Sequence, residues 1–161
     1  MNRHDETEGL KALGSGTPYQ AAPEPDRSLL EAFPNRYPER VYMVSIIFPE
    51  YTSLCPVTGQ PDFGTIAIEY VPDKLCVESK SFKLYMFAWR NERTFMETVT
   101  NTILDDLCAV INPHWCRVKG LFVPRGGTQI HVFAEKYKSS GQNVREFVTA
   151  WRLENAPHKL A

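Results

Sequence analysis

The sequence has no long hydrophobic run, no excess of one charge and no closely paired cysteines. No apolar stretch approaches the ~18 residues needed to cross a bilayer. The amino-terminal segment MNRHDETEGLKALG lacks the apolar core of a secretory signal. Since the formal net charge is only −1, electrostatics favour neither a nucleic acid nor a membrane surface as a partner. We therefore expect a cytoplasmic protein that binds no nucleic acid.

The four cysteines show no CxxC pair and no histidine spacing of the kind that zinc sites use. We expect no metal site and, in a reducing cytoplasm, free thiols. Cys108 and Cys116 fall in helical and strand patterns, where a small buried residue is the simplest interpretation. Cys76 directly precedes a charged segment. Cys55 is the best candidate for a reactive thiol because it lies between two apolar stretches on a loop; a loop cysteine without a function is the alternative.

The length of 161 residues and the hydrophobic fraction of 43% are those of one ordinary globular domain. Residues 1–38 are rich in Pro, Glu, Gly and Ser, and we expect them to form a partly disordered arm along the surface. The pattern SLLEAF, before Pro34, predicts one short helix within this arm. Residues 39–161 are expected to form a single domain.

Two apolar stretches, 41–48 and 64–71, have the alternation and β-branched content of strands. They predict an antiparallel pair joined by a wide loop that carries both Cys55 and Asp62. Two further strands are expected over 115–123 and 128–137, separated by the turn PRGG, whose glycines can adopt positive φ.

Helices are expected between these strand pairs, at residues 79–91 and from about 94 to 111, with a closing helix over 144–153. In the second helix, apolar residues repeat every four positions and predict a stripe facing a core. They are Phe95, Val99, Ile103, Leu107 and Ile111. The order predicts an α+β fold in which a four-stranded antiparallel sheet carries two helices on one face (ββααββ). Its open sheet edges favour oligomerisation.

Several charged residues near the helix starts are candidate binding groups. Lys80 and Lys83 project from nearly the same helix face and could bind a phosphate-rich ligand, whereas a solvated helix face is the alternative. Glu78 and Glu97 lie where a carboxylate stabilises a helix amino terminus, and Glu97 could equally accept hydrogen bonds from a base-like ligand.

Four segments together resemble the nitrile reductases of queuosine biosynthesis in their short, single-module form. They are SLCPVTGQPDFGTI, VESKSFKLYMFAWRN, FMETVTNTILDDL and VKGLFVPRGG. The resemblance extends from about residue 29 to 137 and includes LEAFPNR. It implies reduction of 7-cyano-7-deazaguanine to 7-aminomethyl-7-deazaguanine with NADPH. It also implies a tunnelling fold, in which sheets of several subunits join into barrels, and hence a pentamer or decamer with active sites between subunits.

The resemblance also implies roles for individual residues. Cys55 would attack the nitrile carbon to give a covalent thioimide, and Asp62 would donate a proton to the nitrogen. The implied substrate-binding residues are Val77, Glu78, Ser79, Phe95, Met96 and Glu97. The implied NADPH-binding residues are Ser79, Lys80, Arg125 and Gly126, with Lys83 as an additional contact.

One position departs from the family pattern. Met96 stands where the family usually has histidine, and a methionine cannot donate or shuttle a proton. Two other functions therefore remain as alternatives. One is amidino transfer to the nitrile, as in archaeosine formation, against which the retained ESKSFK and PRGG segments and the near-neutral charge argue. The other is a non-reducing protein that binds deazaguanines and traps the nitrile covalently.

Overall fold

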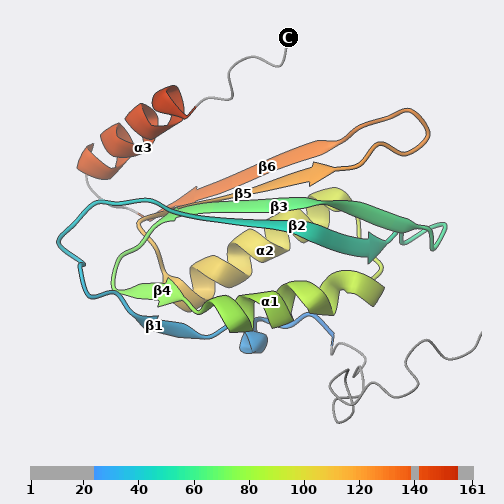
Figure 1. Cartoon of the computed structure of the whole chain (residues 1–161), viewed down its shortest axis with the longest axis horizontal. Coiled ribbons are helices and arrows are strands. Elements are labelled where there is room, and N and C mark those ends of the chain that lie inside the picture. The colour runs from blue at the N-terminus through green and yellow to red at the C-terminus, as the bar shows by residue number, and fades with distance from the viewer. Residues whose placement is uncertain (1–23, 139–141, 156–161) are drawn as a thin grey trace, which may run out of the picture.

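The computed structural model describes residues 24–138 and 142–155. Its main sheet has four antiparallel strands in the order β2-β3-β5-β6. The strands are β2 (Val44–Leu54), β3 (Pro61–Val71), β5 (Trp115–Phe122) and β6 (His131–Tyr137). Helices α1 (Ser79–Ala88) and α2 (Met96–Ile111) cover one face of this sheet (Figure 1). The predicted ββααββ order, with two helices on one face, is confirmed.

The β2–β3 hairpin differs from the expected wide loop. The strands continue much further than 48 and 64, and only residues 55–60 connect them. The prediction that Asp62 lies on the loop is therefore wrong, since Asp62 is a strand residue that pairs with Ser53. Pro61 is compatible with this longer strand because it is the first residue of β3, where no ladder N–H is required. In β2, Pro49 falls at a register shift between Phe48 and Tyr51, a position where a bulge tolerates proline.

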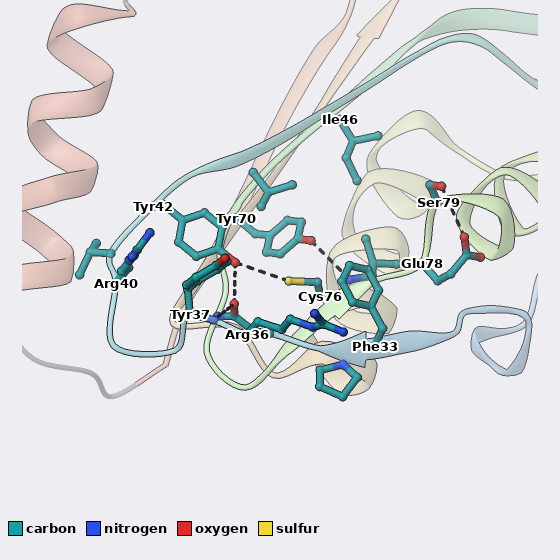
Figure 2. A pocket seen from close by; sticks show the side chains of 15 residues that line it. Phe33, Arg36, Tyr37, Arg40, Tyr42, Ile46, Tyr70, Cys76, Glu78 and Ser79 are labelled. Atoms are coloured by element: carbon teal, nitrogen blue, oxygen red, sulfur yellow. Dashed lines mark hydrogen bonds between the residues drawn. The ribbon is translucent and has the colours of Figure 1, made fainter.

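The described part of the expected arm, residues 24–38, is attached to the domain by a second, two-stranded sheet. The helix predicted over SLLEAF is reduced to the 3₁₀ turn Arg27–Leu29, and β1 (Ala32–Pro34) pairs with β4 (Leu75–Val77). Pro34 explains why this segment is a strand and not a helix, because the residue before a proline favours an extended backbone. A cavity of about 1050 Å³ lies between this small sheet and β2 (Figure 2). Residues 1–23 lie outside the described residues.

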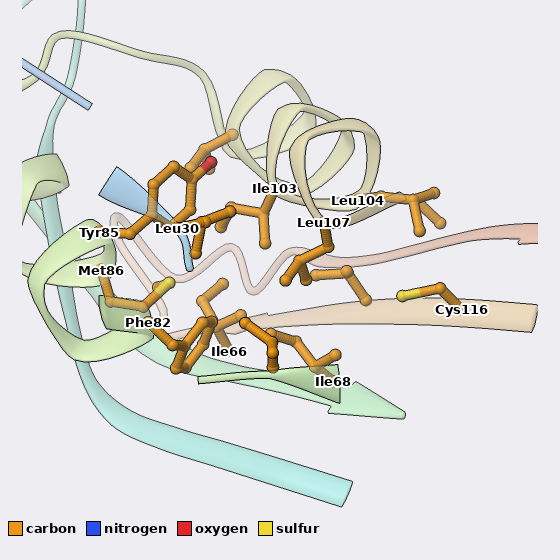
Figure 3. Packing of buried hydrophobic residues seen from close by; sticks show 14 of the residues in the cluster. Leu30, Ile66, Ile68, Phe82, Tyr85, Met86, Ile103, Leu104, Leu107 and Cys116 are labelled. Atoms are coloured by element: carbon orange, nitrogen blue, oxygen red, sulfur yellow. The ribbon is translucent and has the colours of Figure 1, made fainter. Parts of the chain in front are cut away.

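The main core lies between the four-stranded sheet and the two helices (Figure 3). Ile66 and Ile68 of β3 face Ile103 and Leu107 of α2, and Phe82 of α1 packs beside them. The predicted stripe of α2 is buried except for Phe95, which is 56% exposed. This exception follows from the helix boundary, since Phe95 is the N-cap residue and α2 begins one residue later.

The remaining elements are short or lie outside this core. A 3₁₀ turn, Trp89–Asn91, follows α1, so the helix expected over 79–91 is present in two parts. The closing helix is α3 (Gln142–Glu154), which packs Val144 and Val148 against Trp115 on the opposite face of the sheet (Figure 1). No helix in the described ranges is long and apolar enough to span a membrane.

Candidate active site

Cys55 begins a single tight turn between β2 and β3. The backbone N–H of Gly59 donates to the Cys55 carbonyl (2.9 Å), and the N–H of Cys55 donates to the carbonyl of Gln60 (2.8 Å). Pro56 suits the first position of such a turn because its φ is fixed and its missing N–H is not needed there. Gly59, with φ of 71°, supplies the left-handed residue that ends it. Cys55 thus takes the position of an N-cap, from which a side chain accepts N–H hydrogen bonds.

This position makes the thiol acidic. Hydrogen bonds from the hydroxyl and the N–H of Thr58, and from the N–H of Val57, lower the pKa of Cys55 to about 6. The Arg125 guanidinium acts in the same direction, whereas burial of the thiol, which is 5% exposed, opposes these effects. At neutral pH the sulfur is therefore mainly a thiolate, the nucleophilic form of cysteine.

The turn is held against the segment that leads into α2. The N–H of Leu54 donates to the Glu92 carbonyl (2.9 Å), and the N–H of Thr94 donates to the Leu54 carbonyl (3.0 Å). The Arg93 guanidinium lies over Gly59, where a Cβ would come within 3.3 Å of it. These contacts place the thiol next to the start of α2 and restrict the movement of the turn.

Asp62 lies beside the thiol and is paired with Arg125. It is 5% exposed, and its Oδ1 is 2.8 Å from Nη1 of Arg125. Arg125 belongs to the β5–β6 turn, which is closed by reciprocal backbone hydrogen bonds between Arg125 and Thr128 (3.0 and 3.1 Å). Gly126 and Gly127 have φ of 59° and 77°, the conformation required at the centre of such a hairpin turn. The two hairpin turns lie at the same end of the sheet (Figure 1), and the ion pair links the β5–β6 turn to the start of β3.

Two buried polar residues of this site were not identified from the sequence. Tyr51 and Ser53 precede Cys55 at intervals of two residues on β2, and both are buried. Since side chains two apart share a face of a strand, they form a row with the thiol, and Ser53 is the register partner of Asp62. The alternation Tyr-x-Ser-x-Cys was a usable signal, but it required β2 to extend to residue 54.

The first residues of α2 adjoin the Cys55 turn. Phe95 and Glu97 are exposed there, and Met96 is half-buried against the main core. The Met96 carbonyl accepts a hydrogen bond from the Thr100 hydroxyl (2.8 Å). An exposed aromatic ring and an exposed carboxylate thus stand together near the thiol, where a planar ligand could stack and donate hydrogen bonds.

A second group of candidate residues lies where β4 meets α1. Glu78 is the N-cap of α1, and its two carboxylate oxygens accept from the N–H groups of Lys80 (2.8 Å) and Ser81 (2.7 Å). These hydrogen bonds hold the pKa of Glu78 below its ordinary value. The N–H of Val77 donates to the buried hydroxyl of Tyr70 (3.3 Å). This geometry positions the 77–79 backbone firmly and gives Glu78 a structural role whether or not it binds a ligand.

The 1050 Å³ cavity opens onto this second group (Figure 2). Its walls come from β1, β2, β4 and the 35–42 connection, and Val77, Glu78 and Ser79 form part of its lining. Within it, the Tyr42 hydroxyl donates to Oδ1 of Asn35 (2.7 Å) and lies 3.8 Å from the sulfur of Cys76. Burial and the neighbouring Cys76 raise the pKa of Tyr42 to about 12. Cys55 is not among the residues that line this cavity.

Comparison with known proteins places the chain in a family. A family model described as QueF-like protein matches residues 61–141. An NADPH-dependent 7-cyano-7-deazaguanine reductase from Nitratidesulfovibrio vulgaris strain DP4 is 63% identical over 158 residues, covering 96% of this chain and 95% of its own. The chain belongs to the QueF-like family. A reductase of the same name from Desulfovibrio desulfuricans is 61% identical, with 96% of both chains covered, and one from Streptococcus thermophilus is 49% identical over 91% of this chain and 90% of its own.

One similar solved structure is that of the archaeosine synthase QueF-Like in its apo form. Its TM-score is 0.54 at 20% identity, and the match covers 62% of this chain and 96% of that chain. At this identity the similarity supports the fold alone. It agrees with the α+β architecture that the sequence predicted.

In this member of the QueF-like family, the predicted site residues form two separate groups. Arg125 connects the first group, because it pairs with Asp62 and lowers the pKa of the Cys55 thiol. Phe95, Met96 and Glu97 follow Thr94, whose N–H donates to the carbonyl of Leu54, the residue before Cys55. The other group lies at the opposite end of α1, whose ten residues span about 15 Å. It consists of Val77, Glu78, Ser79 and Lys80, with Lys83 near the middle of the helix. A single chain therefore does not bring all of the predicted residues into one pocket.

The residues predicted to hold NADPH have suitable chemistry. Lys80 and Lys83 are exposed cations on one face of α1. The turn at Gly126 is open, since no described atom lies within 4 Å of the position that a Cβ would occupy. Exposed ammonium groups, an arginine and an unobstructed glycine backbone are the groups that bind phosphates in proteins.

Proposed function

We propose that this protein reduces the nitrile of 7-cyano-7-deazaguanine to the aminomethyl group at the expense of NADPH. The observation that carries the proposal is the acidic thiol of Cys55 beside a buried carboxylate, in a chain that is 63% identical to a reductase of that name. A nitrile carbon is electrophilic but carries no leaving group. A thiolate can add to it, provided that the nitrogen receives a proton.

Cys55 and Asp62 have complementary roles in this scheme. The Cys55 sulfur bonds to the nitrile carbon, the electron pair passes to nitrogen, and the proton carried by Asp62 completes a thioimide. The buried position of Asp62 excludes water from this proton transfer, and the Cys55 turn stabilises the thiolate before attack. NADPH supplies hydride, of which two equivalents are required because nitrile to amine is a four-electron change.

The substrate would be recognised by the exposed groups around the thiol. Glu97 and Glu78 are the acceptors proposed for the ring and amino N–H groups of the deazaguanine, and Phe95 is placed to stack on the bicyclic ring. Oε1 of Glu78 accepts from both the Lys80 N–H and the Ser79 hydroxyl, whereas Oε2 accepts only from the Ser81 N–H and retains a lone pair for this role. Val77, Ser79 and Met96 complete the proposed substrate set. The proposed NADPH set is Ser79, Lys80, Lys83, Arg125 and Gly126.

The separation of the two residue groups supports an active site shared between copies of the chain. The Cys55 group of one subunit would be completed by residues 77–80 of a neighbour, since α1 keeps the two groups of one chain apart. The outer strands β2 and β6 provide unpaired edges through which sheets could join into a barrel. We propose a pentamer or decamer of this kind, and a reducing cytoplasm suits its free thiols.

Met96 favours a second candidate, a protein that traps the nitrile without reducing it. A side chain that can transfer protons, usually present at this position in the family, is absent here. The test is to mix protein, 7-cyano-7-deazaguanine and NADPH and to follow nicotinamide absorbance. Reductase activity predicts two equivalents of NADPH oxidised per nitrile. A Cys55 adduct with no oxidation would identify the second candidate instead.

Matched cysteine variants make this test specific. Cys55→Ala should abolish both adduct and oxidation, whereas Cys108→Ala, which removes a half-buried thiol on α2, should retain them. Turnover by Cys55→Ala at the rate of the unchanged protein would overturn the proposed function.

A further inference from the structure

Two thiols that the proposed reaction does not use lie together where α2 leads into β5. Cys108 belongs to the last turn of α2, and Cys116 is the second residue of β5. Cys116 is fully buried in the main core, where Figure 3 shows it beside Leu104 and Leu107. Cys108 is half-buried and packs against the same core.

The sheet register and one ion pair bring these two side chains to the same place. Cys116 is the cross-strand partner of Lys136 on β6, and such partners carry their side chains on one face of the sheet. Nζ of Lys136 lies 3.3 Å from Oδ1 of Asp105 on α2. Cys108 follows Asp105 by three positions and therefore lies on the same face of the helix. The ion pair thus sets the face of α2 that carries Cys108 over the part of β5 that carries Cys116.

The two thiols also influence each other. Cys116 is the largest cause of the lowered pKa of Cys108, and the Lys136 ammonium acts in the same direction, whereas burial and the Asp105 carboxylate oppose them. Cys108 is in turn the largest cause of the raised pKa of Cys116, followed by burial. Of the two sulfurs, that of Cys108 is therefore the one that ionises first. A thiolate beside an ammonium group is the form of cysteine that reacts with oxidants.

The two sulfurs differ in their access to solvent. A cavity of about 420 Å³ lies at the end of α2, and its lining includes Cys108, Asp105, Asn112 and Lys136. Cys116 has no exposed surface and is not among the described residues that line this cavity. A small oxidant that enters the cavity therefore meets Cys108 first, with Cys116 behind it.

We propose that Cys108 and Cys116 are a redox-active pair that forms a reversible disulfide on reaction with a hydroperoxide. Cys108 is the attacking residue and Cys116 the resolving one. The pair is separate from the proposed active site, because Cys108 lies about 18 Å along α2 from Met96 at 1.5 Å per residue. The inference does not depend on the proposed function.

The atoms and electrons balance over two steps. The Cys108 sulfur attacks one oxygen of hydrogen peroxide, the O–O bond breaks, and the other oxygen leaves as hydroxide and takes up the proton that Cys108 released. The Cys116 sulfur then attacks the sulfur of the resulting sulfenic acid, an S–S bond forms, and the oxygen leaves as water with the Cys116 proton. Two thiols have lost two electrons, and one peroxide has become two waters. A dithiol reductant reverses the change by thiol–disulfide exchange.

The test treats the whole protein with hydrogen peroxide, alkylates it with iodoacetamide under denaturing conditions and maps its tryptic peptides by mass without reduction. Both cysteines of the pair fall in one tryptic peptide, residues 94–117, whereas Cys55 and Cys76 fall in two others. In the unchanged protein this peptide should lose two hydrogen atoms and carry no alkyl group. Dithiothreitol added before alkylation should restore two alkylated thiols.

Single variants separate the two roles. In Cys116→Ala, Cys108 should stop at the sulfenic acid and be labelled by dimedone. In Cys108→Ala, Cys116 should remain a thiol at the same peroxide concentration. Cys76 is the internal control, because it is a buried thiol whose neighbour is the Tyr42 hydroxyl, and it should be recovered fully alkylated from every protein.

Two results would overturn the redox-active pair. One is the recovery of two alkylated thiols in peptide 94–117 at a peroxide concentration that oxidises added glutathione. The other is oxidation of Cys108 to a sulfinic acid in the unchanged protein while Cys116 remains a thiol. Loss of two hydrogen atoms from the peptide, reversed by dithiothreitol and absent from both variants, would confirm the disulfide.

Discussion

Thr58 follows Cys55 by three residues in the β2–β3 turn, where its hydroxyl and its backbone N–H are the largest causes of the lowered pKa of the thiol. The geometry follows from local sequence. Pro56 starts the turn, Gly59 ends it, and the intervening N–H groups converge on the side chain that precedes them. A thiolate is thereby stabilised by the backbone, independently of any histidine.

The acidity of Cys55 predicts how its alkylation depends on pH. Because the pKa is lowered to about 6, the thiolate should predominate above pH 6 and be lost as the pH falls below it. Thr58→Val removes the hydroxyl donor and should raise the midpoint of alkylation by about one pH unit, while the N–H donors remain. Peptide mass spectrometry after brief iodoacetamide treatment would measure the midpoint at Cys55.

Two internal comparisons control this measurement. Thr102→Val removes a hydroxyl that bonds the Thr98 carbonyl within α2, and it should leave the midpoint unchanged. Cys116, whose thiol is buried and has a raised pKa, should resist alkylation at all of these pH values. An alkylation midpoint near 8 or 9 for Cys55 would contradict the assigned hydrogen bonds.

Replacing Met96 by histidine should raise the rate of nitrile reduction. Met96→His would add a group able to transfer protons at the start of α2, and general acid catalysis typically contributes about 10²–10⁴-fold in rate. We expect Met96→His to reduce the nitrile faster, with thioimide formation retained in both proteins. Stopped-flow measurement of NADPH oxidation would test this. Equal rates would show that Asp62 and water suffice at this site.

Much of the fold was predictable because its signals are local. The α2 stripe, the PRGG turn and the apolar strands each follow from periodicity or turn chemistry within a short window. The small β1–β4 sheet was missed because it joins segments more than 40 positions apart, and nothing local to Ala32–Pro34 indicates its partner. The extension of β2 beyond 48 was missed because Pro49 resembles a strand end, whereas the structure accommodates it at a register shift.

In the candidate site, too, features with a local sequence signal were predictable and features that join distant segments were not. Cys55 could be chosen from its loop position, and the family resemblance supplied its proposed chemistry. The ion pair between Asp62 and Arg125 could not be predicted, because it depends on two hairpin turns lying at the same end of a sheet. The separation of Glu78 from Cys55 also depends on how α1 crosses the sheet, which sequence spacing does not reveal.

Glu78 has two proposed functions that variants can separate. Glu78→Ala removes the cap of α1 and should lower Tm by about 2–4 °C, as expected for loss of an N-cap in a protein of this size. Glu78→Asp retains a good capping side chain but shortens its reach, so it should preserve Tm. If Glu78 also binds the deazaguanine, Glu78→Asp should raise KM several-fold. Unchanged KM in this variant would limit Glu78 to its structural role.

Two buried tyrosines offer a matched test of hydrogen bonding in the core. The hydroxyl of Tyr85 donates to Oδ2 of Asp106 (2.7 Å), whereas the hydroxyl of Tyr51, which is 1% exposed, has no hydrogen-bond partner of good geometry among the described residues. Removing a bonded hydroxyl that has a charged partner costs about 1.5–3 kcal/mol, but removing an unsatisfied one relieves a penalty. Tyr85→Phe should therefore lower Tm by several degrees, and Tyr51→Phe should leave it unchanged or raise it.

Both variants should be measured at one protein concentration, since assembly also contributes to stability. An equal loss for Tyr51→Phe would mean that its hydroxyl gains a partner in the assembled protein, next to Ser53 and Asp62.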